Sequence, residues 1–226
     1  MIDDWLSEAE RVPSISSLLK EFRDKRDRSA QPEFHYHPLG FTYANLAREG
    51  RVAIRLHVWS ELTRAQEPVW DIHDHIFGFL SLVMAGRSHN ECFEFEPDSE
   101  GDVGLFKVDY DEHASVLTSL GRLGYLRKTE ECLIDAGELY AITANQLHRT
   151  TPCAPFVATL LRTEQHAGKE AVVIGSTQHP FSVAYRREQV DSVASDTLFN
   201  RLISEIEVAH NRTTDARYSD AESGSE

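Results

Sequence analysis

Short runs of strand-forming residues, separated by turns, occupy the middle of the chain from Phe41 to about Arg162. The clearest runs cover residues 52–59, 79–84 and 156–161, and each is dominated by apolar side chains. Many short strands in succession are typical of a sandwich or a barrel, in which sheet faces close over one core. The pattern therefore predicts a mostly β fold for this part of the chain.

Helical patterns flank the β region on both sides. Residues 13–27 carry apolar side chains at helical spacing and end in a charged stretch, which predicts an amphipathic helix packed on the barrel. A second apolar stripe, Leu198, Leu202, Ile203 and Ile206, follows Ser195 and Asp196, which predict an N-cap.

These patterns predict one domain with helical ends, because a chain of 226 residues with 41% hydrophobic content can bury one substantial core. The expected order is an N-terminal helical lead over 1–40, a barrel over 41–190, a helix over 191–210 and a disordered tail over 211–226. The tail is expected to be disordered because it is polar and has few apolar residues.

The chain is strongly acidic, with a formal net charge of −14 and an isoelectric point near 5.2. Nucleic acids and anionic membranes need a basic surface, so we expect neither as a partner. No stretch approaches the ~20 apolar residues that span a bilayer, and no basic, apolar leader is visible. We expect a cytoplasmic monomer or homodimer that binds a small molecule, with Cys92, Cys132 and Cys153 as reduced thiols.

The tripeptide His73-Asp74-His75 is the strongest functional signal, because strand-like residues surround it. On a strand, alternation places both imidazoles on one face and Asp74 on the other. Two imidazoles on one face form two corners of a metal site, and imidazole suits iron, zinc, copper and nickel. Asp74 is expected to orient a loop or a neighbouring histidine instead of binding the metal.

His148 is the candidate for a third ligand, since it follows an apolar strand and a polar turn and opens another strand. The alternative is that these histidines are surface or hydrogen-bonded core residues. The rival pair His35 and His37 is discounted, because Pro38 follows at once and no long apolar strand lies behind it. Arg149, which follows the third ligand, should point to the opposite face and form a structural salt bridge.

Strand parity also suggests which side chains could bind a substrate. In the run 156–163, Arg162 shares a face with Ala158 and Leu160, and its planar guanidinium could hold an acidic group. A surface arginine at a strand end is the alternative. Further candidates for the pocket are Arg55, His57 and Tyr140.

The stretch Ile72-His73-Asp74-His75, followed by an apolar run to Gly86, resembles the first metal-binding motif of cupins, specifically of cysteine dioxygenase-like thiol dioxygenases. Leu147-His148-Arg149 is similar to that family's segment for the third ligand. The resemblance covers about residues 40–165. It implies a jelly-roll barrel with one ferrous ion on His73, His75 and His148.

Departures from the family pattern shape the expected activity. Most cupins add a glutamate four or five residues after the histidine pair, where this chain has Phe79 and Leu80, so a three-histidine site is expected. The arginine that binds the substrate carboxylate in cysteine dioxygenases is replaced by Ala44. The resemblance thus implies a non-haem iron dioxygenase that takes dioxygen and a small thiol or other small anion, but not cysteine.

Two other functions remain open on the sequence. A barrel that has lost the family's substrate-binding residues could keep its metal and sense or sequester a small molecule. Three histidines with an open position also describe a zinc or nickel cupin that performs hydrolysis or isomerisation. The fold does not decide among these functions.

Overall fold

The computed structural model describes residues 32–61, 63, 65–66, 70–110, 114–165, 170–178 and 181–223. The helix predicted over residues 13–27 lies outside these ranges, as does most of the predicted N-terminal lead. Within them, no helix is long and apolar enough to cross a membrane.

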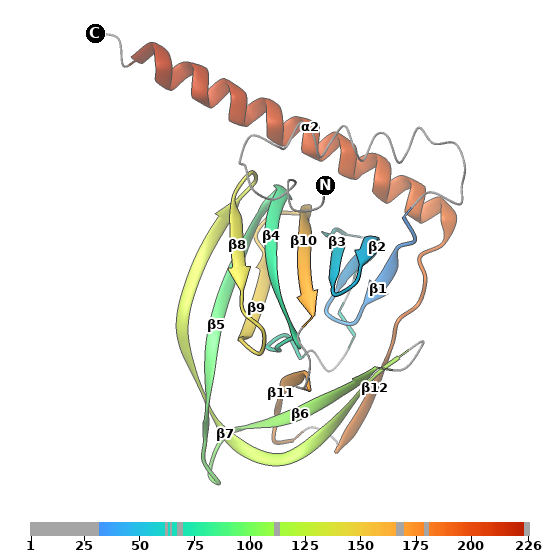
Figure 1. Cartoon of the computed structure of the whole chain (residues 1–226), viewed down its shortest axis with the longest axis vertical. Coiled ribbons are helices and arrows are strands. Elements are labelled where there is room, and N and C mark those ends of the chain that lie inside the picture. Colours follow the sequence, from blue (N-terminus) through green and yellow to red (C-terminus); the bar gives the residue numbers. More distant parts are fainter. Residues whose placement is uncertain are drawn as a thin grey trace.

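Two antiparallel sheets form the β domain (Figure 1). The first has the strand order β1-β2-β3-β10-β4-β8; the second has the order β11-β6-β7-β5-β9, and β12 also pairs with β7. The strands of the first sheet are β1 His35–His37, β2 Phe41–Glu49, β3 Val52–Trp59, β4 Phe77–Ala85, β8 Leu139–Ile142 and β10 Val157–Gln165. Those of the second are β5 Arg87–Pro97, β6 Val103–Tyr110, β7 Ala114–Asp135, β9 Leu147–Pro152, β11 Val172–Ser176 and β12 Ser182–Arg186.

Strands that are distant in the sequence lie next to each other in both sheets. β10 lies between β3 and β4, and β9 pairs with β5. The long strand β7 curves around one end of the molecule (Figure 1) and pairs with β5, β6 and β12. Two sheets with such crossovers make a jelly roll, which confirms the mostly β class predicted from the sequence.

Residues 72–74 close the second sheet, because this extended segment lies between β9 and β11. The amide of His73 donates to the carbonyl of His148 at 3.1 Å, and the amide of His148 donates back at 2.9 Å. On the other side, Ile174 donates to Ile72 and Asp74 donates to Val172, both at 2.9 Å. The histidine motif is therefore held by backbone hydrogen bonds on both of its edges.

Helix α2 (Ser192–Ser223) lies across the first sheet (Figure 1). Its predicted apolar stripe is buried, and Leu202 and Ile206 are fully buried against strand residues such as Leu56 and Leu160. Removing these side chains from water supplies the main attraction between helix and sheet. The strands thus have one face under α2 and the other face toward the barrel interior.

The ends of α2 differ from the prediction. The N-cap is Asp191, whose Oδ1 accepts the amides of Val193 and Ala194 at 3.0 Å, and not the predicted pair Ser195 and Asp196. The helix also continues to Ser223, through most of the tail that was expected to be disordered. Extending an existing helix costs much less free energy than nucleating one, so a polar segment can follow a packed helix in the same conformation.

Gly86 makes the turn between β4 and β5, and a side chain is excluded there. Its φ is +76°, and an added Cβ would lie 2.2 Å from the carbonyl oxygen of Phe156. Glycine adopts such a φ without strain and lets the neighbouring backbone approach closely.

Candidate metal centre

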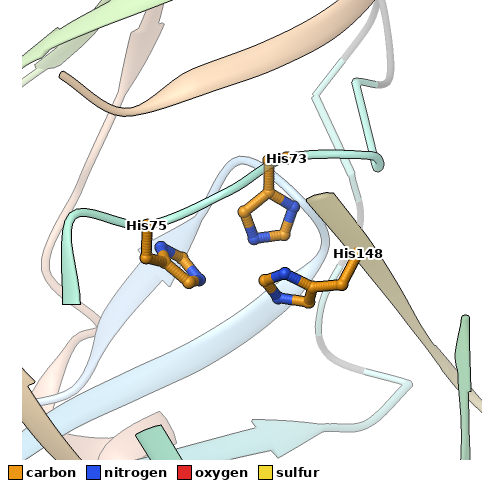
Figure 2. A group of neighbouring side chains, drawn as sticks. All are labelled: His73, His75 and His148. Atoms are coloured by element: carbon orange, nitrogen blue, oxygen red, sulfur yellow. The ribbon is translucent and has the colours of Figure 1, made fainter. Parts of the chain in front are cut away.

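Three histidines converge on one point inside the barrel (Figure 2). His73 lies in the segment that closes the second sheet, His75 follows that segment directly, and His148 lies opposite His73 on β9. The ring centroid of His73 lies 4.8 Å from that of His75 and 4.6 Å from that of His148, and the remaining pair is 5.2 Å apart. Their candidate ligand nitrogens all lie within 4.8 Å of one another.

Backbone carbonyls select the tautomer of two of the rings. Nδ1 of His73 lies 3.0 Å from the carbonyl oxygen of Asp71, and Nδ1 of His148 lies 3.0 Å from that of Gln146. A carbonyl oxygen only accepts hydrogen bonds, so each Nδ1 carries the proton. Each Nε2 then keeps its lone pair, as a metal ligand requires.

The same rings are held in the neutral form. Burial, together with the nearby His73, lowers the pKa of His148 to about 3. Burial also lowers the pKa of His73, and it lowers that of His75 well below the ordinary value, with His73 and His148 adding to the effect. At neutral pH the three imidazoles are therefore uncharged, which suits a cation.

A metal ion fits this donor set. Imidazole nitrogens bind zinc at ~2.0–2.1 Å, and the three candidate ligand nitrogens, all within 4.8 Å of one another, are close enough to surround one central ion. The ring of Phe79 borders the cluster, and its centroid lies 5.9 Å from that of His75. This described cluster consists of histidines only.

The two neighbours of the ligands have the structural roles predicted for them. Asp74 is buried, and its Oδ1 accepts the amide of Val172 on β11 at 2.6 Å. Arg149 forms salt bridges with Glu91 at 2.6 Å and Asp71 at 3.3 Å. Both side chains stabilise the segment that presents the histidines.

A cavity of about 380 Å³ opens onto the three histidines. Among the substrate-binding candidates, Arg55, His57 and Tyr140 line it. Burial raises the pKa of Tyr140, while Ser81, Asn90 and Thr150 lower it in part. The phenol is therefore protonated at neutral pH, and it can donate a hydrogen bond.

Arg162 does not line the cavity, so its expected place in the pocket is wrong. Strand parity does put it on one face with Ala158 and Leu160, but those residues belong to the core under α2. The opposite face of β10, with Leu161 and Thr163, lines the cavity. Arg162 instead lies 3.5 Å from Glu164 in an ion pair.

Several cavity residues were not found by sequence reasoning. Arg187 reaches the cavity from beyond β12, and Tyr110 reaches it from the end of β6, with no local pattern to indicate either. For Trp59 and Phe77, by contrast, the sequence contained a signal in the form of strand parity. Trp59 shares strand parity with Arg55 and His57, and Phe77 shares parity with His75.

No protein-family model and no curated protein matches this chain. A cupin superfamily protein from Desulfitobacterium hafniense DCB-2 aligns over 55% of this chain and 76% of its own length, with 12% identity and a TM-score of 0.31. A chain from crystal structures of the DMSP lyases RdDddP and RnDddQII aligns over 58% of this chain and 51% of its own length, with 14% identity and a TM-score of 0.34. Because both alignments are partial, the fold is assigned from the strand order and pairing.

Proposed function

We propose that this chain is a mononuclear non-haem iron(II) dioxygenase of the cysteine dioxygenase-like cupin type. In this proposal His73, His75 and His148 hold the ion, and the substrate is a small thiol or another small anion. The main support is one observation: three neutral imidazoles, of which His73 and His148 keep a free Nε2, border a cavity whose charged lining is mostly arginine.

The neutral ligand set favours an anionic substrate. Three imidazoles leave the charge of a divalent ion uncompensated, so an anion gains free energy at an open coordination position. Arg55 adds a second positive charge on the same cavity. The chain's residues would thus bind and orient an anion next to the ion.

The overall reaction shows what the ion and the cavity must each supply. A bound ferrous ion supplies the one-electron chemistry toward dioxygen that amino-acid side chains lack. For a thiolate, the overall change converts R–S⁻ and O₂ into R–SO₂⁻, and the electrons that sulfur loses are those that dioxygen gains. No external reductant is needed. The apolar rings of Phe77 and Phe79, which line the cavity, help to exclude water from its end near the three histidines.

A substrate other than cysteine is supported by the surroundings of Ala44. This residue is fully buried in the core under α2, so its position offers no cation to the cavity. The guanidinium comes instead from Arg55 on β3, which lies opposite Asn45 of β2. A cation at a different place favours a substrate of different shape.

Elemental analysis and oxygen uptake test this proposal. The protein is purified without added metal or affinity chelation, reconstituted anaerobically with ferrous ion and supplied with a panel of thiols in an oxygen electrode. We expect near-stoichiometric iron and thiol-dependent oxygen consumption. Zinc as the retained metal, or iron without uptake for any thiol, would contradict a thiol dioxygenase.

A matched pair of variants tests the ligand set. His148→Ala should abolish metal retention, while circular dichroism shows a folded barrel. The control is His89→Ala, since His89 belongs to a second cluster, with Glu91 and Glu131, that could hold a metal. Lys128 and Arg149 already pair with those carboxylates, so we expect the control to keep its metal. If His89→Ala lost the metal and His148→Ala kept it, the metal site would be the second cluster.

A further inference from the structure

The charge of the cavity is opposite to the charge of the chain. The protein carries a formal net charge of −14, yet its cavity is lined by Arg48, Arg51, Arg55 and Arg187 and by one carboxylate, Asp71. That carboxylate is paired with Arg149 at 3.3 Å. A concave surface with an excess of one sign concentrates ligands of the other, so the cavity favours anions.

Arg55 and Arg187 differ in the hydrogen bonds and ion pairs that their guanidinium groups already make. Arg187 donates through Nε to the hydroxyl of Ser115 at 2.7 Å, and another of its nitrogens lies 3.4 Å from Nε2 of His37. Arg55 has no carboxylate within ion-pair distance in the described part of the chain, and its buried Nε has no hydrogen-bond partner there. A partly buried cation of this kind is normally paired, so Arg55 keeps donors for an anionic ligand.

Phe77 connects Arg55 to the metal centre. Its ring stacks on that of His75, with centroids 4.5 Å apart and an angle of 8° between the planes. The guanidinium carbon of Arg55 lies 4.9 Å from the centroid of the same ring. A ligand that reaches both the metal and Arg55 therefore extends along the Phe77 ring.

The cavity wall beside Arg55 is aromatic. The ring of Phe41 packs against His57 at 4.7 Å and against Trp59 at 4.9 Å. Such walls favour a flat, unsaturated body over a flexible aliphatic chain, through stacking and edge contacts. The cavity volume of about 380 Å³ corresponds to roughly a dozen water molecules, which is enough room for a substituted aromatic ring.

We propose that the cavity selects an aromatic carboxylate, with its carboxylate on Arg55, its ring against Phe77 and the wall of Phe41 and Trp59, and a thiolate or phenolate at its far end toward the three histidines. The carboxylate and ring parts follow from the cavity itself. The part about the far end rests on the proposed function, because it assumes an ion on His73, His75 and His148.

Calorimetry with a redox-inert metal tests the proposal without turnover. Zinc-loaded protein is titrated with 4-mercaptobenzoate, with thiophenol, which lacks the carboxylate, and with mercaptoacetate, which lacks the ring. We expect 4-mercaptobenzoate to bind tightest of the three. Arg55→Gln should weaken its binding at least about tenfold and leave thiophenol unchanged, while Arg162→Gln, on the other face of the sheet, should change neither.

The outcomes separate this inference from the proposed function. If the protein fails to retain metal, benzoate is titrated into the metal-free protein, where Arg55→Gln should still abolish binding. Retained benzoate binding without oxygen uptake would refute the dioxygenase and support the aromatic carboxylate. Tighter binding of mercaptoacetate than of 4-mercaptobenzoate by the wild-type protein would overturn the inference, and this comparison does not need the Arg55→Gln variant to fold. Equal affinities of folded Arg55→Gln and the wild type for 4-mercaptobenzoate would also overturn it.

Discussion

Protonation of single histidines controls how the interior of this barrel responds to acid. The pKa of His57 falls to about 3, first because burial penalises the charged ring and then because Arg55 and His73 lie nearby. The pKa of His148 falls to about 3 for the same main reason. Between about pH 3 and pH 6.5 both rings are therefore neutral in the folded protein, whereas they are protonated in the unfolded chain.

This difference in pKa between the folded and unfolded states predicts that the protein loses stability in acid, and that His57 contributes to the loss. Below pH 6.5 the unfolded chain takes up a proton that the folded state excludes, so the free energy of unfolding falls as the pH drops toward 3. Above that window His57 contributes no pH dependence. In metal-free protein we expect His57→Phe to reduce the slope by up to about 1.4 kcal/mol per pH unit. Denaturant unfolding between about pH 7 and about pH 5 measures it; equal slopes in both proteins would contradict the assignment.

The sequence indicated the histidine cluster better than it indicated the residues of the cavity. His73, His75 and His148 lie together as predicted. Alternation along the local backbone is enough to place the first two on one face, whereas His148 was recognised from its position after an apolar strand and a polar turn. Arg162 was misplaced because both faces of β10 are buried, with Leu160 at 1% exposure on one side and Thr159 at 0% on the other. Parity groups residues on a face, but it does not say which face is the cavity.

Two glycines with similar backbone angles allow a test of whether the close approach of the chain near the ends of β4 and β10 affects stability. Gly86 has a φ of +76°, and its added Cβ would meet the Phe156 carbonyl, whereas Gly50 has a φ of +56° with nothing within 4 Å. Gly50→Ala should cost about 1–2 kcal/mol, the price of a left-handed conformation. Gly86→Ala should cost clearly more, because the backbone must also shift. Denaturant unfolding compares the two, and equal losses would show that the close approach has no energetic effect.

At the level of elements, the pattern predicted where apolar faces occur more reliably than where elements end. The stripe of α2 is buried as predicted because helical spacing aligns Leu198, Leu202 and Ile206 on one face. The start at Asp191 was missed because several short polar residues precede the stripe, and any of them can cap a helix. Cap choice depends on where the preceding chain enters, which is set by the barrel.

In the whole molecule, metal binding should stabilise the closure of the second sheet. The backbones of His73 and His148 are hydrogen-bonded to each other, and their rings face the same point. Zinc should therefore slow amide exchange at these two residues more than in the β2–β3 pairing. It should also raise the free energy of unfolding by about 2.7 kcal/mol at a hundredfold excess over Kd. Hydrogen exchange with and without zinc measures this; uniform protection across both sheets would contradict a local effect.

The strand order itself could not be predicted from the sequence. β10 lies between β3 and β4, and the segment 72–74 completes the second sheet far from its sequence neighbours. These pairings depend on long-range contacts between strands of similar apolar composition, so no local pattern distinguishes one partner from another. The resemblance to cupins implied the jelly roll, but residue patterns reached only the class of sandwich or barrel.

Under the proposed function, the reciprocal hydrogen bonds between His73 and His148 also make metal retention depend on the register of the second sheet. A chain that closes its second sheet one residue out of register turns one member of this pair toward the opposite face, because side chains alternate along each strand. Such a molecule keeps nearly the same strands but loses the three-nitrogen set. If the proposed metal site is right, the amount of metal retained by a preparation would therefore count the molecules whose barrels have closed in the correct register.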